Sequence, residues 1–183
     1  MRAQFGGTLL ALLAATSAAV AAEPAAPLPG GANQVTEVHG SWTMRCVSST
    51  KQSPTGVPIC TVFQQQVDPN RRPVLYVGLN TISADGAKVA LTLPLGLDVN
   101  GGVTLQIDDG PVTSTIPFKT CLPRGCFITA DWPASTIKDL GWGTKLKLVA
   151  QQLSGQPATF TVSLDGLGSA VSHAIALQSS NAQ

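Results

Sequence analysis

The sequence predicts an all-β fold of short antiparallel strands, arranged as a two-sheet sandwich or a barrel and accompanied by one or two short helices. Apolar and polar side chains alternate with period two over many short segments, which is typical of strands with one buried face. Turn-forming Gly, Asn and Asp residues recur between these segments. No long helical pattern separates them, so neighbouring strands are expected to pair antiparallel.

The expected strands follow one another closely along the chain. Trp42, Met44 and Cys46 alternate with more polar neighbours, and the same pattern returns around Leu146. The clearest hairpin turns at Asp85-Gly86 between two apolar segments. The nine expected strands cover residues 38–47, 58–67, 73–82, 87–94, 103–108, 112–118, 126–131, 144–152 and 157–165.

Two short helical segments are expected among the strands. Pro133 suits a first helical turn and Gly141 suits a helix stop, with apolar residues on one face between them, which predicts a helix over 134–140. The apolar residues of 167–175 are spaced for a second helix or a last amphipathic turn.

The N-terminus is typical of a secretory signal peptide. Arg2 supplies a positive charge, residues 8–20 are apolar, and small residues follow up to Ala22. We expect cleavage after Ala22, with Ala21 or Ala19 as the alternatives, so that no membrane-spanning segment remains in the mature chain. The expected organisation is a signal peptide over 1–22, a flexible Pro/Ala/Gly-rich leader over 23–36, a β domain over 37–178 and a disordered tail over 179–183.

Composition limits the classes of partner. The 183 residues include only 11% charged side chains and carry a formal net charge of +1. A chain of this length forms one domain, and its low net charge provides no long-range field that would attract nucleic acid. We therefore expect no nucleic-acid binding.

The four cysteines are expected to form disulfides. They are Cys46, Cys60, Cys121 and Cys126, and behind a secretory signal such residues meet an oxidising compartment. Of the three connectivities, Cys46 with Cys60 and Cys121 with Cys126 is favoured, because neighbouring strands bring the first pair together and a short turn closes the second. The alternatives, a four-thiolate zinc site or a redox centre, usually require C-x-x-C spacing, which is absent.

No catalytic, cofactor or metal-binding constellation is found. His39 and His173 lie far apart in the sequence, and Ser169 is not placed in a G-x-S-x-G motif. Asp108 and Asp109 precede a Gly-Pro turn, where adjacent carboxylates more often cap the turn than act as acid and base. We expect neither an enzyme nor a bound cofactor.

The candidate contact residues are basic side chains in loops, which favour an acidic or polar partner. Two of them follow a turn, and two flank the small cysteine loop; they are Arg71, Arg72, Lys119 and Arg124. Trp132 and Trp142 bracket the first expected helix, and both are expected to pack in the core or between helix and sheet.

An ordered set of short motifs resembles the invasion-associated locus B family over about Val38 to Ala176. The set comprises Gly40–Cys46, Cys60 before a Gln-rich strand, Leu93–Leu97, Gly102–Asp108, Cys121 with Gly125-Cys126, and Ser163–Leu167. Where family members commonly have a bulky aromatic after the late Gly, this chain has Leu167.

The resemblance implies an immunoglobulin-like β-sandwich in a periplasmic, secreted or outer-membrane-associated protein of a Gram-negative bacterium. It brings no established catalytic residue, and a role in host-cell invasion applies only to pathogens. Two hypotheses follow: a non-enzymatic binding module that uses loops and edge strands, or a periplasmic protein that binds or hydrolyses a small molecule between its sheets.

Overall fold

The structure, a computed structural model, describes residues 28–48 and 57–179. The expected signal peptide over 1–22 and residues 180–183 of the expected tail lie outside the described residues. Within the described ranges, no helix has the length and apolar character needed to cross a membrane.

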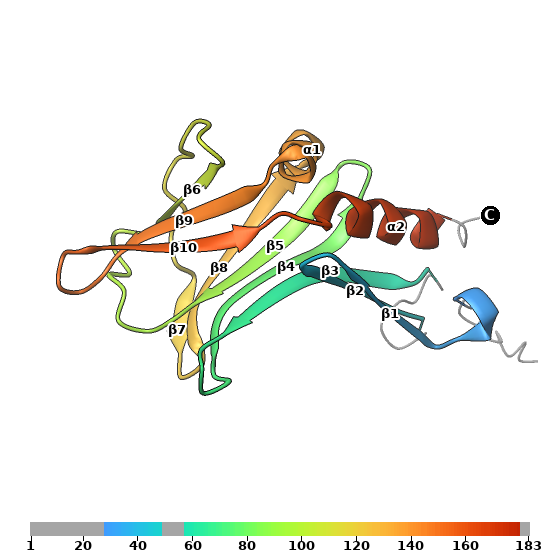
Figure 1. Cartoon of the computed structure of the whole chain (residues 1–183), viewed down its shortest axis with the longest axis horizontal. Coiled ribbons are helices and arrows are strands. Elements are labelled where there is room, and N and C mark those ends of the chain that lie inside the picture. Colours follow the sequence, from blue (N-terminus) through green and yellow to red (C-terminus); the bar gives the residue numbers. More distant parts are fainter. Residues whose placement is uncertain (1–27, 49–56, 180–183) are drawn as a thin grey trace, which may run out of the picture.

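Two antiparallel sheets form most of the fold (Figure 1). The large sheet has seven strands in the order β1-β2-β3-β4-β5-β8-β7 and the small sheet has three in the order β10-β9-β6. The strands of the large sheet are β1 (Gln34–His39), β2 (Trp42–Val47), β3 (Ile59–Val67), β4 (Pro73–Ser83), β5 (Gly86–Leu93), β7 (Thr120–Leu122) and β8 (Gly125–Pro133). Those of the small sheet are β6 (Val103–Ile107), β9 (Lys145–Gln151) and β10 (Pro157–Ser163).

Two α-helices accompany the sheets, as expected. Helix α1 (Ala134–Trp142) connects β8 to β9, and helix α2 (Leu167–Ser179) follows β10, so that β10 and α2 lie end to end along the large sheet (Figure 1). Helix α1 passes through Gly141 and ends at Trp142, with Gly143 as its C-cap. A short 3₁₀ turn, η1 (Pro29–Gly31), precedes β1.

The core lies between the large sheet on one side and the small sheet with α2 on the other. Alternate residues of the central strands are buried, as the period-two pattern predicts. Helix α2 packs against strands β1 to β4 and α1 against β5 and β8. The buried residues of α2 are Leu167, Ala170, Val171, Ala174 and Leu177.

A buried polar clasp joins the N-terminal hairpin to the end of β10. The Gln64 side-chain amide donates hydrogen bonds to the backbone carbonyls of Ser41, at 3.0 Å, and Ser163, at 3.1 Å. The Trp42 indole Nε1–H donates to the same Ser163 carbonyl at 2.9 Å, and the Ser41 N–H donates to the Asp165 carbonyl at 3.0 Å. Gln64 is 9% exposed, so these bonds satisfy polar groups that water does not reach.

The strand expected over 38–47 is in fact a hairpin of two strands. His39 pairs with Trp42, which leaves Gly40 and Ser41 as a two-residue turn. Gly40 has φ of 53°, a conformation that Gly adopts readily and that matches the twist of the flanking strands. The alternation continues through such a turn, so the pattern alone did not locate it.

Three further expectations differ from the structure. The expected flexible leader over 23–36 includes part of the fold, because Leu28 is 1% exposed in the core and β1 begins at Gln34. Residues 112–118 form no strand; they contact β6 through isolated bridges at Val112 and Ile116 and through hydrogen bonds between Thr113 and Leu105. Strand β7 was not expected, because its three residues are too few to show a period.

We predict that Gly166→Ala destabilises the fold by about 2 to 4 kcal/mol, from left-handed strain plus overpacking. Gly166 has φ of 85°, and an added Cβ would lie 2.0 Å from the His39 carbonyl oxygen. Gly155 is the matched control: its φ is 82°, but nothing lies within 4 Å of an added Cβ, so Gly155→Ala should cost only the strain, about 1 to 2 kcal/mol. Urea unfolding measures both, and equal losses would contradict the close packing of the hairpin at Gly166.

Candidate functional site

The outer face of the large sheet carries a mixed row of aromatic and polar side chains. Strand register aligns Gln65, Tyr76, Thr92 and Phe127 across β3, β4, β5 and β8. Their neighbours along each strand point into the core, so this row belongs to the opposite, outer face. The row is half-buried or exposed, although it includes two aromatic rings.

A groove of about 880 Å³ lies along this row. We call it the basic–aromatic groove; its lining residues are Gln65, Asp68, Arg72, Pro73, Val74, Tyr76, Thr92, Pro94, Leu95, Pro123, Arg124 and Phe127. Its lining combines arginines with aromatic, proline and leucine side chains. Such a mixture occurs where proteins bind peptides or other proteins.

Glycine at position 78 determines how the aromatic side chains lie. An added Cβ at Gly78 would meet the Tyr76 hydroxyl oxygen at 2.5 Å, so the Tyr76 ring lies flat over this glycine. The ring stacks on Phe63, with centroids 6.0 Å apart, and the Arg45 guanidinium lies 5.6 Å from the Phe63 centroid. Burial raises the pKa of the Tyr76 hydroxyl, which therefore stays protonated and able to donate a hydrogen bond.

Two of the four predicted contact residues, Arg72 and Arg124, line this groove. Arg72 pairs with Asp68 at 2.7 Å, and the Asp68 carboxylate also accepts the Arg72 backbone N–H. The backbone and side chain of Arg72 hold the pKa of Asp68 below its ordinary value. Arg124 is exposed and has no ion-pair partner in the described part of the chain, so its charge is available to a ligand.

The other two predicted contact residues, Arg71 and Lys119, are exposed but do not line the groove. Arg71 occupies the loop before β4 in a left-handed conformation, with φ of 63°. The backbone N–H of Lys119 donates to the Phe127 carbonyl at 2.7 Å, which places it beside β8.

Both disulfides join residues directly opposite on adjacent strands. Cys46 of β2 bonds to Cys60 of β3, and Cys121 of β7 bonds to Cys126 of β8; in each pair the Cα atoms are 4.0 Å apart. This is the pairing favoured from the sequence. The second disulfide closes the turn that carries Pro123 and Arg124, and so holds one wall of the basic–aromatic groove.

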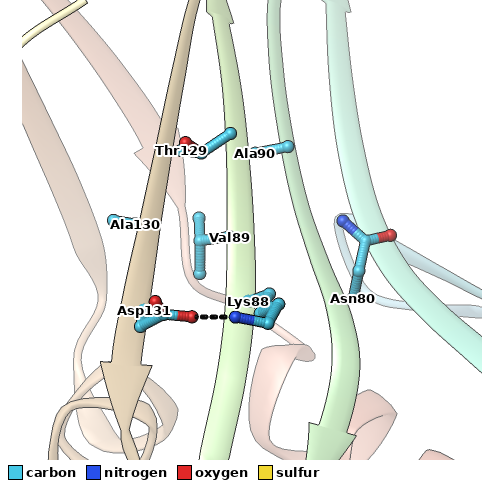
Figure 2. A pocket seen from close by; sticks show the side chains of 7 residues that line it. All are labelled: Asn80, Lys88, Val89, Ala90, Thr129, Ala130 and Asp131. Carbon is cyan, nitrogen blue, oxygen red and sulfur yellow. Dashed lines mark hydrogen bonds and ion pairs between the residues drawn. The ribbon is translucent and has the colours of Figure 1, made fainter. Parts of the chain in front are cut away.

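A second, more polar hollow of about 310 Å³ lies further along the same strands (Figure 2). The small Ala90 side chain opposite Thr129 leaves this space. At its end, Lys88 pairs with Asp131 at 2.8 Å. Both side chains are exposed and neutralise each other, so the hollow offers little charge to a ligand.

A third cavity, the inter-sheet pocket, has a volume of about 660 Å³. It lies between β6 and β9 of the small sheet and β8 with α1. Its lining comprises residues of the 110–116 loop and the apolar side chains of Leu105, Ile107, Trp132, Leu140 and Leu146. Such a mainly apolar lining with a few polar groups is typical of small-molecule sites.

The two tryptophans that bracket α1 have different environments. Trp132 is buried, as expected, but Trp142 is 81% exposed, so the expectation that both pack in the core or between helix and sheet was wrong for Trp142. It is the last residue of α1, and its ring borders a groove between α1 and α2. The local sequence pattern does not show whether another element buries an apolar side chain at the end of a helix.

The two acidic residues of the Gly-Pro turn act within the fold. The hydroxyl and backbone N–H of Thr144 and the backbone N–H of Lys145 donate to the Asp108 carboxylate, and these bonds hold its pKa below the ordinary value. Asp109 pairs with Lys147 at 3.1 Å. Asp108 therefore fastens the end of β6 to the start of β9.

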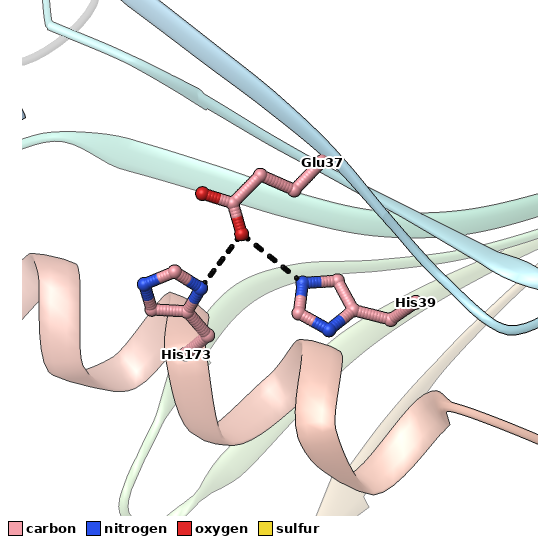
Figure 3. A group of neighbouring side chains, drawn as sticks. All are labelled: Glu37, His39 and His173. Atoms are coloured by element: carbon pink, nitrogen blue, oxygen red, sulfur yellow. Dashed lines mark ion pairs between the residues drawn. The ribbon is translucent and has the colours of Figure 1, made fainter.

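The structure brings together two histidines that the sequence analysis treated separately. His39 and Glu37 of β1 meet His173 of α2 (Figure 3), and one carboxylate oxygen, Glu37 Oε2, lies 3.3 Å from His39 Nε2 and 2.8 Å from His173 Nδ1. The only local signal was that Glu37 and His39, two residues apart, share a strand face. Their approach to α2 depends on tertiary packing.

Comparisons with known proteins point to one family. The family model of the Invasion associated locus B (IalB) protein matches residues 42–174. The chain is 34% identical over 157 residues to the Invasion protein B homolog of Brucella abortus strain 2308, covering 84% of this chain and 86% of the relative. It is 29% identical over 156 residues to Invasion protein B of Bartonella bacilliformis, covering 84% and 81% of the two chains.

A solved structure agrees with the sequence relatives. The crystal structure of invasion associated protein b from Bartonella henselae matches with a TM-score of 0.69 and 29% identity. The match covers 80% of this chain and 98% of that one. The likeness therefore extends over nearly the whole of the solved domain.

Proposed function

The chain belongs to the invasion-associated locus B family, and we propose that it is an exported, non-enzymatic envelope protein that binds an acidic segment of another protein in the basic–aromatic groove. The observation that carries this proposal is the position of Arg124, which has no ion-pair partner among the described residues and lines the same groove as the aromatic rings of Tyr76 and Phe127. The relatives are named for invasion, and such a role would apply to this chain only in a pathogen.

Export to an oxidising compartment is supported by two independent features. The N-terminal 22 residues have the pattern of a cleaved signal peptide. All four cysteines are paired in disulfides, which persist in the periplasm or outside the cell and are rare in the cytosol.

The chemistry of the groove supports an acidic partner. Arg124 offers a free guanidinium, whose planar donors suit a carboxylate, while Arg72 is shared with Asp68. The Tyr76 and Phe127 rings and the exposed Leu95 supply apolar area beside these charges. An extended segment that alternates acidic and apolar residues satisfies both features.

We predict that a photo-crosslinking amino acid at Leu95 yields a saturable adduct in the envelope of the source bacterium, whereas the same residue at Leu153 does not. Both leucines are exposed, but Leu95 lines the groove and Leu153 lies in the β9–β10 hairpin. Mass spectrometry should map the adduct to a segment rich in Asp and Glu. Arg124→Glu should reduce its yield about tenfold or more, because it replaces attraction by repulsion.

The matched control is Lys138→Glu, which makes the same charge change at an exposed residue of α1. It should leave the adduct unchanged. Equal adducts at Leu95 and Leu153, no adduct at Leu95, or equal effects of the two charge reversals would each contradict the proposed groove.

The inter-sheet pocket supports a second candidate function, binding of a small apolar molecule. Its volume is in the range of ligand sites, and its apolar residues come from both sheets and α1. Among the described residues that line it there are serine, threonine and aspartate side chains but no histidine or lysine that would activate a hydroxyl as a nucleophile, so the lining favours binding over hydrolysis.

If the pocket binds apolar molecules, the mature protein should take up N-phenyl-1-naphthylamine with saturable fluorescence enhancement. Ile116→Trp should abolish this signal, because the half-buried Ile116 lines the pocket and a larger ring would fill it. Leu95→Trp, in the basic–aromatic groove, is the control. Absence of saturation, or equal signals from both variants, would exclude this second function.

A further inference from the structure

We propose that Glu37, His39 and His173 form a binding site for a divalent transition-metal ion such as Zn²⁺. Each residue offers one ligand atom, and these three atoms lie within 4.8 Å of one another (Figure 3). Two imidazole nitrogens and one carboxylate oxygen form a donor set that suits Zn²⁺ and its neighbours in the first transition row. The family model matches from residue 42 onward, so it does not include Glu37 or His39.

The backbone positions these ligands on two facing elements. Glu37 and His39 are two residues apart on β1 and therefore share the face that turns toward α2. Ser169 and His173 are four residues apart on α2 and therefore share one helix face. The pairs meet so that Ser169 contacts His39 and His173 contacts Glu37.

Hydrogen bonding determines which nitrogen of His39 is free. The Ser169 hydroxyl lies 3.0 Å from the Gly166 carbonyl, which only accepts, so the single hydroxyl proton is donated there. The His39 Nδ1, 3.2 Å from the same hydroxyl, must then carry the hydrogen and donate it to Ser169. The neutral His39 ring consequently presents an unprotonated Nε2.

This Nε2 atom faces another lone pair. It is fully buried and has no hydrogen-bond partner in the described structure, although Glu37 Oε2 lies only 3.3 Å away. Two lone pairs at that distance repel each other unless a positive charge, carried by a proton or a metal ion, lies between them. A metal ion fills that requirement and also uses the remaining nitrogen, His173 Nδ1, 2.8 Å from the same carboxylate oxygen.

The distances agree with tetrahedral coordination after small adjustments. Metal–ligand bonds of about 2.0 to 2.1 Å place the ligand atoms of a tetrahedral site about 3.4 Å apart. The 3.3 Å between Glu37 and His39 already matches, and the other two separations change by no more than about 1.5 Å, within the reach of side-chain rotation. The Ser169 hydroxyl then orients His39 from behind, as a second hydrogen-bonding partner does in metal sites.

The site keeps one side open to solvent. The His39 side chain is 18% exposed, whereas those of Glu37 and His173 are 38% and 40% exposed. Three protein ligands and an accessible fourth position are typical of zinc sites that bind a water molecule or a substrate atom. A bound ion would also join β1 to α2.

The chain provides no other histidine and no free cysteine that would compete for the ion. It contains only two histidines, both in this cluster, and its four cysteines are all in disulfides. Binding of a borderline metal ion by the untagged mature protein can therefore be assigned to one place.

The test is calorimetric titration of the untagged mature protein with ZnCl₂, and with MgCl₂ as the oxygen-preferring comparison. We expect one Zn²⁺ per chain, no Mg²⁺ binding, and a rise in Tm with Zn²⁺. His173→Ala and Glu37→Gln should each weaken Zn²⁺ binding at least tenfold, and Ser169→Ala about tenfold through the loss of orientation. Asp131→Asn, an exposed carboxylate on β8, is the control that should change nothing.

A second measurement uses the unaltered chain, so its result does not depend on whether the variants fold. Nitrogen-15 NMR of the two imidazoles should show His39 Nε2 and His173 Nδ1 shifting together and saturating at one equivalent of Zn²⁺. No saturable binding, unshifted imidazoles, or His173→Ala binding Zn²⁺ as tightly as the original protein would overturn the site.

Discussion

The buried amide of Gln64 is the contact on which the arrangement of this molecule depends. It donates to a carbonyl in the β1–β2 turn and to another at the end of β10, two segments far apart in sequence. The Trp42 indole reinforces the same junction, and Gly166 allows the backbone of the hairpin to approach closely. Because unsatisfied carbonyls in such a place are costly, the hairpin has one preferred position against the small sheet and α2.

With the β1–β2 hairpin in this position, the two faces of the large sheet have different environments. The inner face is covered by the small sheet and α2, and the clasp holds β1 beside α2, which brings Glu37 and His39 to His173. The outer face keeps the alternate residues of the same strands, including Tyr76, Phe127 and the groove beside Arg124. The strand period thus places core residues and candidate contact residues on opposite sides of one sheet.

Much of the fold followed from local patterns, while most of the candidate sites did not. Alternation and turn residues predicted the central strands, and cysteine spacing predicted two disulfides, because these features act between chain neighbours or adjacent strands. The alternating pattern did not show that Gly40-Ser41 form a turn. It also did not show that Val112 and Ile116 form isolated bridges and not a strand. Arg72 and Arg124 were indicated as contacts, but Tyr76 beside them was not, because only the register reveals their shared groove. The cluster around His173 depends wholly on tertiary packing.

The most direct test of the clasp is the difference in urea unfolding free energy between Gln64→Leu and Gln65→Leu. The two variants make the same chemical change at adjacent residues of β3, one buried and one exposed. If the Gln64 amide fastens the hairpin, its removal leaves the Ser41 carbonyl without this donor and should cost about 1 to 3 kcal/mol more than the change at Gln65. Losses that agree within about 0.5 kcal/mol would contradict the account.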